Sequence, residues 1–491
     1  MTRPLVRRRG LAIVLSALLS PGISAQDGER PNVLLIIVDD LRPLVGAYGD
    51  DLAHTPNIDD LAASGVVFEN TFASVPICGA SRASLFSGRK PTTNRFLNFS
   101  SRLDRDLPGV PSLPGWFRDH GYYTLASGKI FDSMLDSPES WSEPLWSPEG
   151  EWTSAIEPDE RGEHIQRAYL DNPEGVLGPA FERLSVEDSD YPDGKIADKT
   201  VEDLRRLSDR GEPFFLAVGF RKPHLPFNAP ARYWDLYDPA DFELPTTYYE
   251  LAVGAPPHVV HTSFELRDQY TGIPPEGLLE EPQALNLIHA YRAAVSYADA
   301  LVGKVLGGLE DNGLDDNTIV MLIGDHGWNL GEQTMWTKMN LFDIALHTPM
   351  IIRDPSRGSG RAGAITDFLD IFPTLIELAG LPAPDELDGV SLVPVLEDTT
   401  RTVKHASFSR WFDGESVRTE RYRYTEWRSE EGKITDRMLF DLLNDSEETR
   451  SVADEAEYES VVRELSALIT ADDSFVEWSP IVKRNVANRT Q

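Results

Sequence analysis

The stretch Asn32-Val33-Leu34-Leu35-Ile36-Ile37-Val38 contains six consecutive apolar residues. A run of this length and composition is typical of a β-strand that is buried on both faces of a sheet. Three further apolar runs have the same character, and they span residues 214–220, 317–323 and 349–352. Together these four runs predict the strands of one large sheet.

Helical patterns separate the predicted strands and cover residues 57–64, 81–87, 113–120, 198–208 and 290–312. Strands that alternate with helices predict an α/β fold, in which a large, mostly parallel sheet is sandwiched by helices. Two long segments, 133–190 and 238–285, are rich in Pro, Asp, Glu and Ser and have weak periodicity. We expect both to be surface insertions, which often shape substrate access.

The pattern changes after Leu381-Pro382-Ala383-Pro384-Asp385. Short alternating segments at 416–419 and 422–427 predict antiparallel strands, and a helix is expected near 457–470. A chain of 491 residues exceeds the size at which single cores stop growing. We therefore expect an N-terminal domain over residues 26–380 and a smaller C-terminal α+β subdomain over residues 381–491.

The N-terminus has the pattern of a secretory signal peptide. Arginines at positions 3, 7, 8 and 9 precede a short apolar stretch, and small residues lead to a cleavage site after Ala25. We expect residues 1–25 to be removed and the mature protein to be exported, to the periplasm or the extracellular space. Because no later run of 18 apolar residues follows, no membrane span is predicted.

The chain is strongly acidic, with 46 basic and 80 acidic residues and a formal net charge of −34. Proteins that bind nucleic acids normally carry a basic surface, so no nucleic-acid partner is expected. An anionic substrate would have to be bound by a local group of basic side chains, against the overall field of the protein.

Acidic side chains follow two of the predicted strands. Asp39 and Asp40 come directly after the first run, and Asp325 and His326 directly after the run at 317–323. Ligands of parallel sheets bind at the carboxyl ends of the strands, where these four residues meet if the strands are neighbours. Either pair alone is more typical of a solvated turn. Both pairs together predict a site for a hard divalent cation such as Ca²⁺ or Mg²⁺ rather than zinc.

Cys78 is the only cysteine, so it cannot form an intrachain disulfide. It precedes a predicted helix, whose free backbone N–H groups attract anions. Arg82, in the first turn, adds a donor fork that suits tetrahedral oxyanions. The alternative for Cys78 is an inert, buried small hydrophobic residue.

Further cationic candidates are Lys129, Lys338 and His224. Each lysine taken alone is more typical of a solvated surface amine. His224 lies between Pro223 and Pro226 after a buried strand, which leaves its backbone little freedom.

The segment Cys78-Gly79-Ala80-Ser81-Arg82 resembles the Cys-x-(Pro/Ala)-x-Arg signature of type I, formylglycine-dependent sulfatases of the alkaline phosphatase superfamily. The resemblance extends from Pro31 to about Ala453 and is nearest to the iduronate-2-sulfatases. Other matching stretches are residues 39–43, 87–91, 215–224, 325–332 and 418–424.

The resemblance implies an alkaline-phosphatase-like fold with a catalytic N-terminal domain. It also implies that a maturation enzyme oxidises Cys78 to formylglycine, whose hydrate attacks the sulfur of a sulfate ester. One Ca²⁺ ion, with Mg²⁺ the less fitting choice, would be bound by the modified Cys78 and by four further residues, Asp39, Asp40, Asp325 and His326.

The basic candidates receive roles from the same resemblance. Arg82 would hold the formylglycine hydrate, and Lys129 and Lys338 would bind sulfate oxygens. His224 would protonate the leaving alcohol, with Lys338 as a second contributor. Because they lie close in sequence to these segments, Arg95 and Trp336 are candidates for substrate contact.

Two positions depart from the family pattern. Asp132 stands where the family usually has a histidine shortly after the lysine, and Ala80 replaces the commoner proline of the signature. The first departure bears on the breakdown of the sulfated intermediate and on the substrate subtype. The second leaves open which maturation enzyme acts.

Three functions fit these residues. The first is an exported sulfatase that acts on a carbohydrate, with uronic-acid-containing glycans as the expected substrates. The second is a phosphodiester or phosphonate ester hydrolase that uses the same formylglycine and metal. The third is a non-catalytic, calcium-dependent glycan-binding protein.

Overall fold

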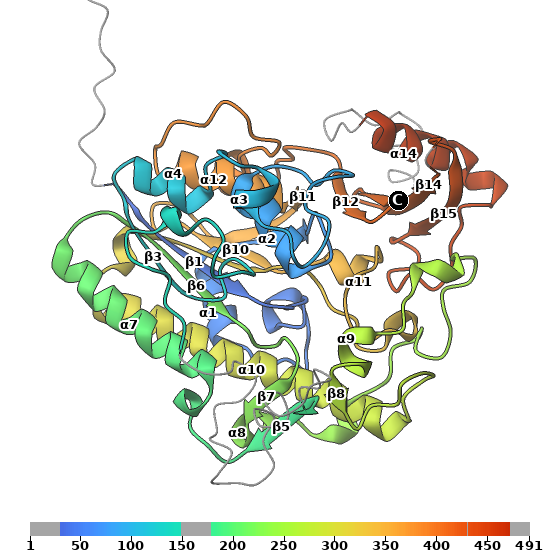
Figure 1. The fold of residues 1–491 in the computed structure, drawn as a ribbon, viewed down its shortest axis with the longest axis horizontal. Helices are drawn as coiled ribbons and strands as arrows, with labels where there is room; N and C mark the ends of the chain where they lie inside the picture. Colours follow the sequence, from blue (N-terminus) through green and yellow to red (C-terminus); the bar gives the residue numbers. More distant parts are fainter. Residues whose placement is uncertain (1–29, 149–177, 430, 472–491) are drawn as a thin grey trace, which may run out of the picture.

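Seven strands form the central sheet of the computed structural model, which describes residues 30–148, 178–429 and 431–471 (Figure 1). In sheet order they are β11 (Gly360–Asp367), β2 (Val66–Phe72), β10 (Met350–Arg353), β9 (Thr318–Gly324), β1 (Asn32–Val38), β6 (Phe214–Phe220) and β3 (Tyr123–Gly128). The four predicted strands are confirmed as β1, β6, β9 and β10. The predicted signal peptide lies outside the described residues.

Only β10 runs against its neighbours, because it pairs antiparallel with both β9 and β2, whereas the other pairs in this sheet are parallel. The chain returns from β9 to β10 through irregular segments, a 3-10 turn (Glu332–Thr334) and one short helix, α11 (Asp343–Leu346). The prediction of a mostly parallel sheet is confirmed.

Helices cover both faces of the sheet (Figure 1). On one face lie α1 (Pro56–Ser64), α7 (Pro192–Arg210) and α10 (Glu281–Asp311). On the other lie α2 (Cys78–Ser87), α3 (Leu103–Asp106), α4 (Leu113–Asp119) and α12 (Ile371–Leu378). Along β1, the side chains of Leu34 and Ile36 pack against the face covered by α1, α7 and α10. Those of Val33 and Leu35 pack against the opposite face, which α2, α3, α4 and α12 cover. This double burial explains why the run is apolar without interruption.

A second, antiparallel sheet follows near the C-terminus. Its strands are β12 (Ser407–Trp411), β13 (Gly414–Arg418), β14 (Tyr422–Arg428) and β15 (Ile434–Asp441). Helix α14 (Glu459–Ala471) packs on this sheet around a separate small core that contains Val417, Tyr424 and Leu465. The predicted α+β character of this region is confirmed, and the boundary at residue 381 stays a prediction.

The two predicted insertions contain short elements. These are β4 (Gly178–Pro179), β5 (Phe181–Leu184), α9 (Phe264–Arg267) and β8 (Tyr270–Thr271). Strand β5 pairs with β7 (Phe227–Pro230), near α8 (Ala231–Trp234), and α13 (Val393–Glu397) lies further along the chain. The prediction that 238–285 is a surface segment is wrong in part, because Tyr248 and Leu266 are 1% exposed and belong to the core. Contacts with other apolar side chains bury these two residues, although the sequence of the segment has only weak periodicity.

None of the described helices combines the length and the apolar character that a membrane crossing requires.

Candidate active site

The carboxyl ends of β1 and β9 bring the predicted metal ligands together. The two strands are paired along their whole length, so Asp39-Asp40 and Asp325-His326 emerge side by side. The backbone N–H of Asp40 donates to Asp325 Oδ1 at 2.9 Å. All four residues are at most 1% exposed. The prediction that the two pairs meet at this edge is confirmed.

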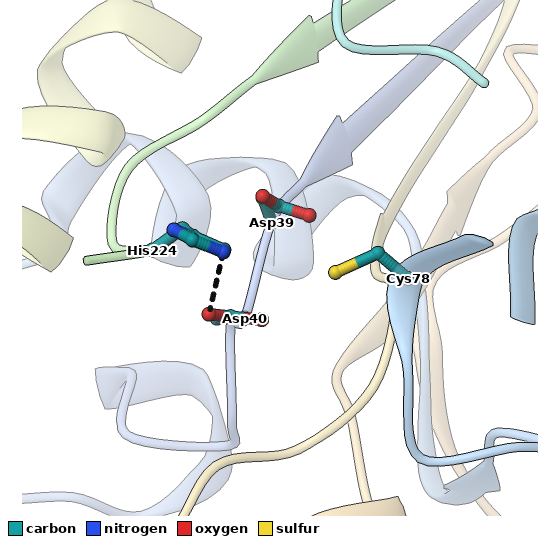
Figure 2. A group of neighbouring side chains, drawn as sticks. All are labelled: Asp39, Asp40, Cys78 and His224. Atoms are coloured by element: carbon teal, nitrogen blue, oxygen red, sulfur yellow. Dashed lines mark ion pairs between the residues drawn. The ribbon is translucent and has the colours of Figure 1, made fainter. Parts of the chain in front are cut away.

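Cys78 reaches the same edge from the first turn of α2 (Figure 2). Its Sγ lies 3.2 Å from His326 Nε2, and the residue is 5% exposed. Ligand atoms of Asp39, Asp40, Cys78 and His224 lie within 4.8 Å of one another, as do those of Cys78, Asp325 and His326. His224, which was not among the predicted ligands, therefore borders the same cluster.

Close packing fixes the start of α2. A side chain at Gly79 would place its Cβ 2.1 Å from the carbonyl oxygen of Phe99, so only glycine lets that loop pass. The hydroxyl of Ser81 donates to the carbonyl of Asp325 at 2.6 Å and ties the helix to the end of β9. The helix begins at Cys78, three residues earlier than predicted.

Arg82 is fully buried below the cluster and directs its donors at four acceptors. Its guanidinium bonds Asp39 Oδ1 at 2.8 Å and Asp325 Oδ2 at 2.9 Å. Nη1 donates to the carbonyls of Lys129 and Ile130. Arg82 thus holds the carboxylates of Asp39 and Asp325 in place. Its predicted contact with an oxidised Cys78 stays a prediction.

Each acid of the Asp39-Asp40 pair has its own lysine. Lys129 Nζ lies 2.8 Å from Asp39 Oδ2 and 3.1 Å from Asp132 Oδ1. Lys338 Nζ lies 3.0 Å from Asp40 Oδ2. Both lysines are buried rather than solvated on the surface. Asp132, the departure from the family pattern, is thereby a partner of Lys129.

Burial governs the ionisation of this cluster. It raises the pKa of Asp40 to about 7, against the opposing charge of Lys338. Burial alone would raise the pKa of Asp39, but Lys129 and Arg82 hold it well below the ordinary value. Burial, followed by repulsion from Asp39, raises the pKa of the Cys78 thiol. The thiol therefore stays protonated and is a poor nucleophile in this form.

His224 faces the cluster from the turn after β6 (Figure 2). Its Nε2 lies 3.1 Å from Glu265 Oε1 and 3.8 Å from Asp40 Oδ2, and its Nδ1 lies 2.6 Å from the carbonyl oxygen of Leu225. Lys222 Nζ donates to the carbonyl of His224 at 2.8 Å and holds the turn. Burial and the charge of Lys338 lower the pKa of His224, which Glu265 opposes.

Sequence reasoning missed Glu265. It lies in α9, within the segment predicted to be a surface insertion, and its Oε1 is 2.9 Å from Lys338 Nζ. His261 belongs to the same segment. Its Nδ1 accepts from the backbone N–H of Ser263 at 2.9 Å, so its Nε2 donates to the carbonyl of Lys338 at 2.6 Å. No motif or periodicity in this segment distinguishes these two residues.

The donor set fits a hard divalent cation. Three buried carboxylates supply oxygens, the ligands that Ca²⁺ and Mg²⁺ prefer. His326 Nδ1 lies 2.9 Å from the carbonyl of Gly327, which leaves Nε2 as the nitrogen that faces the cluster. The residues present therefore fit a divalent ion with mostly oxygen ligands.

The two predicted substrate contacts lie elsewhere. Arg95 donates to the carbonyl of Lys90 at 2.7 Å, and Trp336 is 2% exposed within the core beside Tyr248. Among the described contacts, neither side chain bonds a member of the cluster. Their role in substrate contact stays a prediction.

Comparison with known proteins identifies the family. The model of the sulfatase family matches residues 31–381, and that of the C-terminal region of N-sulphoglucosamine sulphohydrolase matches residues 331–473. Human iduronate 2-sulfatase is 34% identical over 416 residues, which is 79% of this chain and 72% of the human protein. These matches confirm the resemblance to type I sulfatases and, within them, to the iduronate-2-sulfatases.

Two further proteins are similar over most of their length. The Δ4,5-hexuronate-2-O-sulfatase of Bacteroides thetaiotaomicron is 28% identical and covers 91% of this chain and 90% of its own. The crystal structure of a phosphonate monoester hydrolase of Agrobacterium radiobacter has a TM-score of 0.71 at 25% identity, covering 90% of this chain and 95% of that one. This chain belongs to the sulfatase family and is a sulfuric ester hydrolase.

Proposed function

We propose that this exported protein hydrolyses a sulfate ester of a uronic-acid-containing carbohydrate, with formylglycine formed from Cys78 as the nucleophile and Ca²⁺ as the metal. One observation carries the proposal: Cys78, three buried acids and two buried lysines converge at the carboxyl ends of β1 and β9. The named activities of the human and Bacteroides relatives support a uronate sulfate as substrate.

The state of Cys78 supports the modification. A protonated, 5% exposed thiol cannot serve as a thiolate nucleophile, and a simple sulfated side chain would be a stable ester. Formylglycine hydrate would supply one hydroxyl that attacks sulfur and a second whose deprotonation expels sulfate by C–O cleavage and restores the aldehyde. Because α2 buries Cys78, we expect the maturation enzyme to act before this helix packs against the sheet.

The cationic side chains account for sulfate binding. Lys129 and Lys338 neutralise Asp39 and Asp40 in this structure. Where the charge of those carboxylates is balanced by a divalent cation, both ammonium groups can turn to sulfate oxygens. Lysine suits this exchange because its charge sits on a flexible stem.

His224 is positioned to protonate the leaving alcohol. Glu265 Oε1 lies 3.1 Å from His224 Nε2 and 2.9 Å from Lys338 Nζ, so the two side chains share one carboxylate. A proton donor held within hydrogen-bond reach of a leaving oxygen accelerates departure by about 10²–10⁴-fold. We assign His224 as the acid and Glu265 as its positioning partner.

A second candidate function is phosphonate monoester hydrolysis, which the similarity to the Agrobacterium enzyme favours. It would use the same residues, so only turnover separates it from the first. A non-catalytic glycan-binding role would leave Cys78, Lys129 and Lys338 without a purpose.

The decisive experiment measures turnover of three probes by protein from an export-competent host. The probes are a disaccharide with a 2-sulfated uronic acid, 4-nitrophenyl sulfate and a phenyl phosphonate monoester. We expect sulfate release to be fastest, and Cys78→Ala to lose at least about 10⁴-fold in kcat. Mass analysis of the peptide around residue 78 should show formylglycine. An active enzyme with an intact thiol, or faster phosphonate turnover, would overturn the proposal.

A further inference from the structure

A cavity of about 210 Å³ adjoins the proposed active site. We call it the aromatic cleft and define it by six of its lining residues, His258, Phe264, Met339, Trp411, Phe412 and Trp427. Three parts of the chain meet there: the segment before α9, the loop after Lys338, and the antiparallel C-terminal sheet. No residue of the cleft is used by the chemistry proposed above.

The wall of the cleft is continuous with the active site. His261 lines the cavity and donates to the carbonyl of Lys338. Met339 follows Lys338 directly, and its backbone N–H donates to the carbonyl of Pro76, two residues before Cys78, at 3.1 Å. Phe264, which also lines the cavity, precedes Glu265. The cleft and the proposed sulfate site therefore share the backbone at Lys338 and Met339, and this is the observation that relates the two.

Phe412 is unusual in its backbone and in its exposure. It is the first residue of the two-residue loop between β12 and β13, with a φ of 51°, where tight hairpins favour glycine or asparagine. Its side chain is 64% exposed, although burial would stabilise the fold. A large apolar side chain held at a strained and exposed position suggests selection for contact with a ligand.

The chemistry of the cleft suits the ring of a sugar. Phe412 lies against Trp411, with ring centroids 4.4 Å apart, and His258 meets Trp427 edge-on at 5.0 Å. Aromatic faces are negative and attract the C–H groups on the apolar face of a pyranose. Asp413, which also lines the cavity, accepts hydrogen bonds from hydroxyl groups and repels anions. These features favour a ring with free hydroxyls over one with a second sulfate.

We propose that the aromatic cleft binds the pyranose ring linked to the sulfated sugar, with Phe412 as the stacking platform and Asp413 as a hydroxyl acceptor. The inference rests on the proposed function and adds a second subsite to it. The cavity is smaller than the about 300 Å³ at which pockets for drug-sized ligands begin, so it takes one ring. The protein is then selective for a glycan over an isolated sulfate ester.

The test compares two substrates in the mature enzyme. One is a disaccharide of 2-sulfated uronic acid linked to an unsulfated hexosamine, and the other is 4-nitrophenyl sulfate, which has no second sugar. We expect Phe412→Ala to lower kcat/KM for the disaccharide about tenfold, mainly through KM, and to leave 4-nitrophenyl sulfate within about twofold. Asp413→Asn should likewise lower kcat/KM for the disaccharide and leave that for 4-nitrophenyl sulfate nearly unchanged.

Tyr249→Ala is the matched control, because Tyr249 is also 64% exposed but does not line the cleft. This variant should leave kcat/KM unchanged for both substrates. If Phe412→Ala and Asp413→Asn lower turnover of both substrates equally, or affect the disaccharide no more than Tyr249→Ala does, the cleft is not a sugar subsite. Failure of the wild-type enzyme to release sulfate from either substrate would instead refute the proposed function.

Discussion

Of the buried clusters of charge among the described residues, two differ in what their cations can do. The site cluster combines Asp39, Asp40 and Asp325 with Arg82 and two lysines. The junction cluster, between α11 and the antiparallel sheet, is defined by four residues, Asp343, Arg418, Arg423 and Glu448. Arg423 of the junction cluster is as fully buried as Arg82 of the site cluster, so burial of charge alone does not identify an active site.

The junction cluster is a fixed structural connection. Arg418 Nε and Arg423 Nη2 each lie 2.8 Å from Asp343 Oδ1, and the backbone N–H of Asp343 donates to Glu448 Oε2 at 2.7 Å. Planar guanidinium groups hold one geometry, whereas the lysines of the site can exchange partners. The stretch 418–424, which resembles the family, thus includes the arginines of a structural connection.

Removal of the metal should reveal the largest functional difference between the two clusters. A bound divalent cation stabilises developing charge by several kcal/mol, so chelation should lower kcat by about 10³-fold, and added Ca²⁺ should restore it better than Mg²⁺. The melting temperature should fall with it, because an ion that binds only the folded state stabilises that state. Unchanged activity and unchanged melting after verified removal of all metal would exclude a metal site here.

Asp343→Ala should lower the stability of the protein and leave its turnover nearly unchanged. It leaves two buried arginines without their shared carboxylate, so the free energy of unfolding should fall by about 3–5 kcal/mol. Turnover of 4-nitrophenyl sulfate well below the melting temperature should stay within about twofold. Denaturant unfolding measures the first quantity. Asp454→Ala, which removes an 86% exposed partner of Arg437, should cost about 1 kcal/mol or less.

Glu265→Gln tests the assigned partner of His224. Loss of the carboxylate that holds both His224 and Lys338 should lower kcat by about tenfold or more for a sugar sulfate. The loss should be smaller for 4-nitrophenyl sulfate, whose leaving group needs little protonation. Exposed Glu276, in the same segment, supplies the control Glu276→Gln. Equal losses with both substrates would assign Glu265 a purely structural role.

Glu448→Gln should change stability rather than turnover, and its effect depends on pH. Burial, followed by repulsion from Asp343, raises the pKa of Glu448 to about 8, against about 4.3 for an unfolded glutamate. Between these values the folded state retains a proton that the unfolded chain releases, so stability falls as pH rises. Glutamine does not titrate and can still accept from Asp343.

The Glu448→Gln variant should therefore match the wild type near pH 5 and exceed it by roughly 3 kcal/mol at pH 8. Urea unfolding at both pH values measures the difference. Glu447→Gln, at an exposed neighbouring position, should show no such dependence on pH. A constant offset between Glu448→Gln and the wild type at both pH values would contradict the raised pKa.

Sequence patterns predicted the middle of the large sheet better than its other strands. β1 and β6 are buried on both faces, so their apolar runs are continuous. β3 and β11 lie at the edges and contain glycine and threonine, and β2 carries Glu69 and Asn70 in its middle. None of these three was predicted, because their strand character comes from pairing with a neighbour.

By itself, the sequence determined which side chains follow the buried strands and that a helix begins close to Cys78, because such features depend on residues close together in the chain. Tertiary structure alone decided that β1 and β9 are neighbours, that Lys129 and Lys338 are buried beside acids, and that Glu265 joins them. These contacts join segments separated by tens to hundreds of residues, and local propensity carries no information about such pairings.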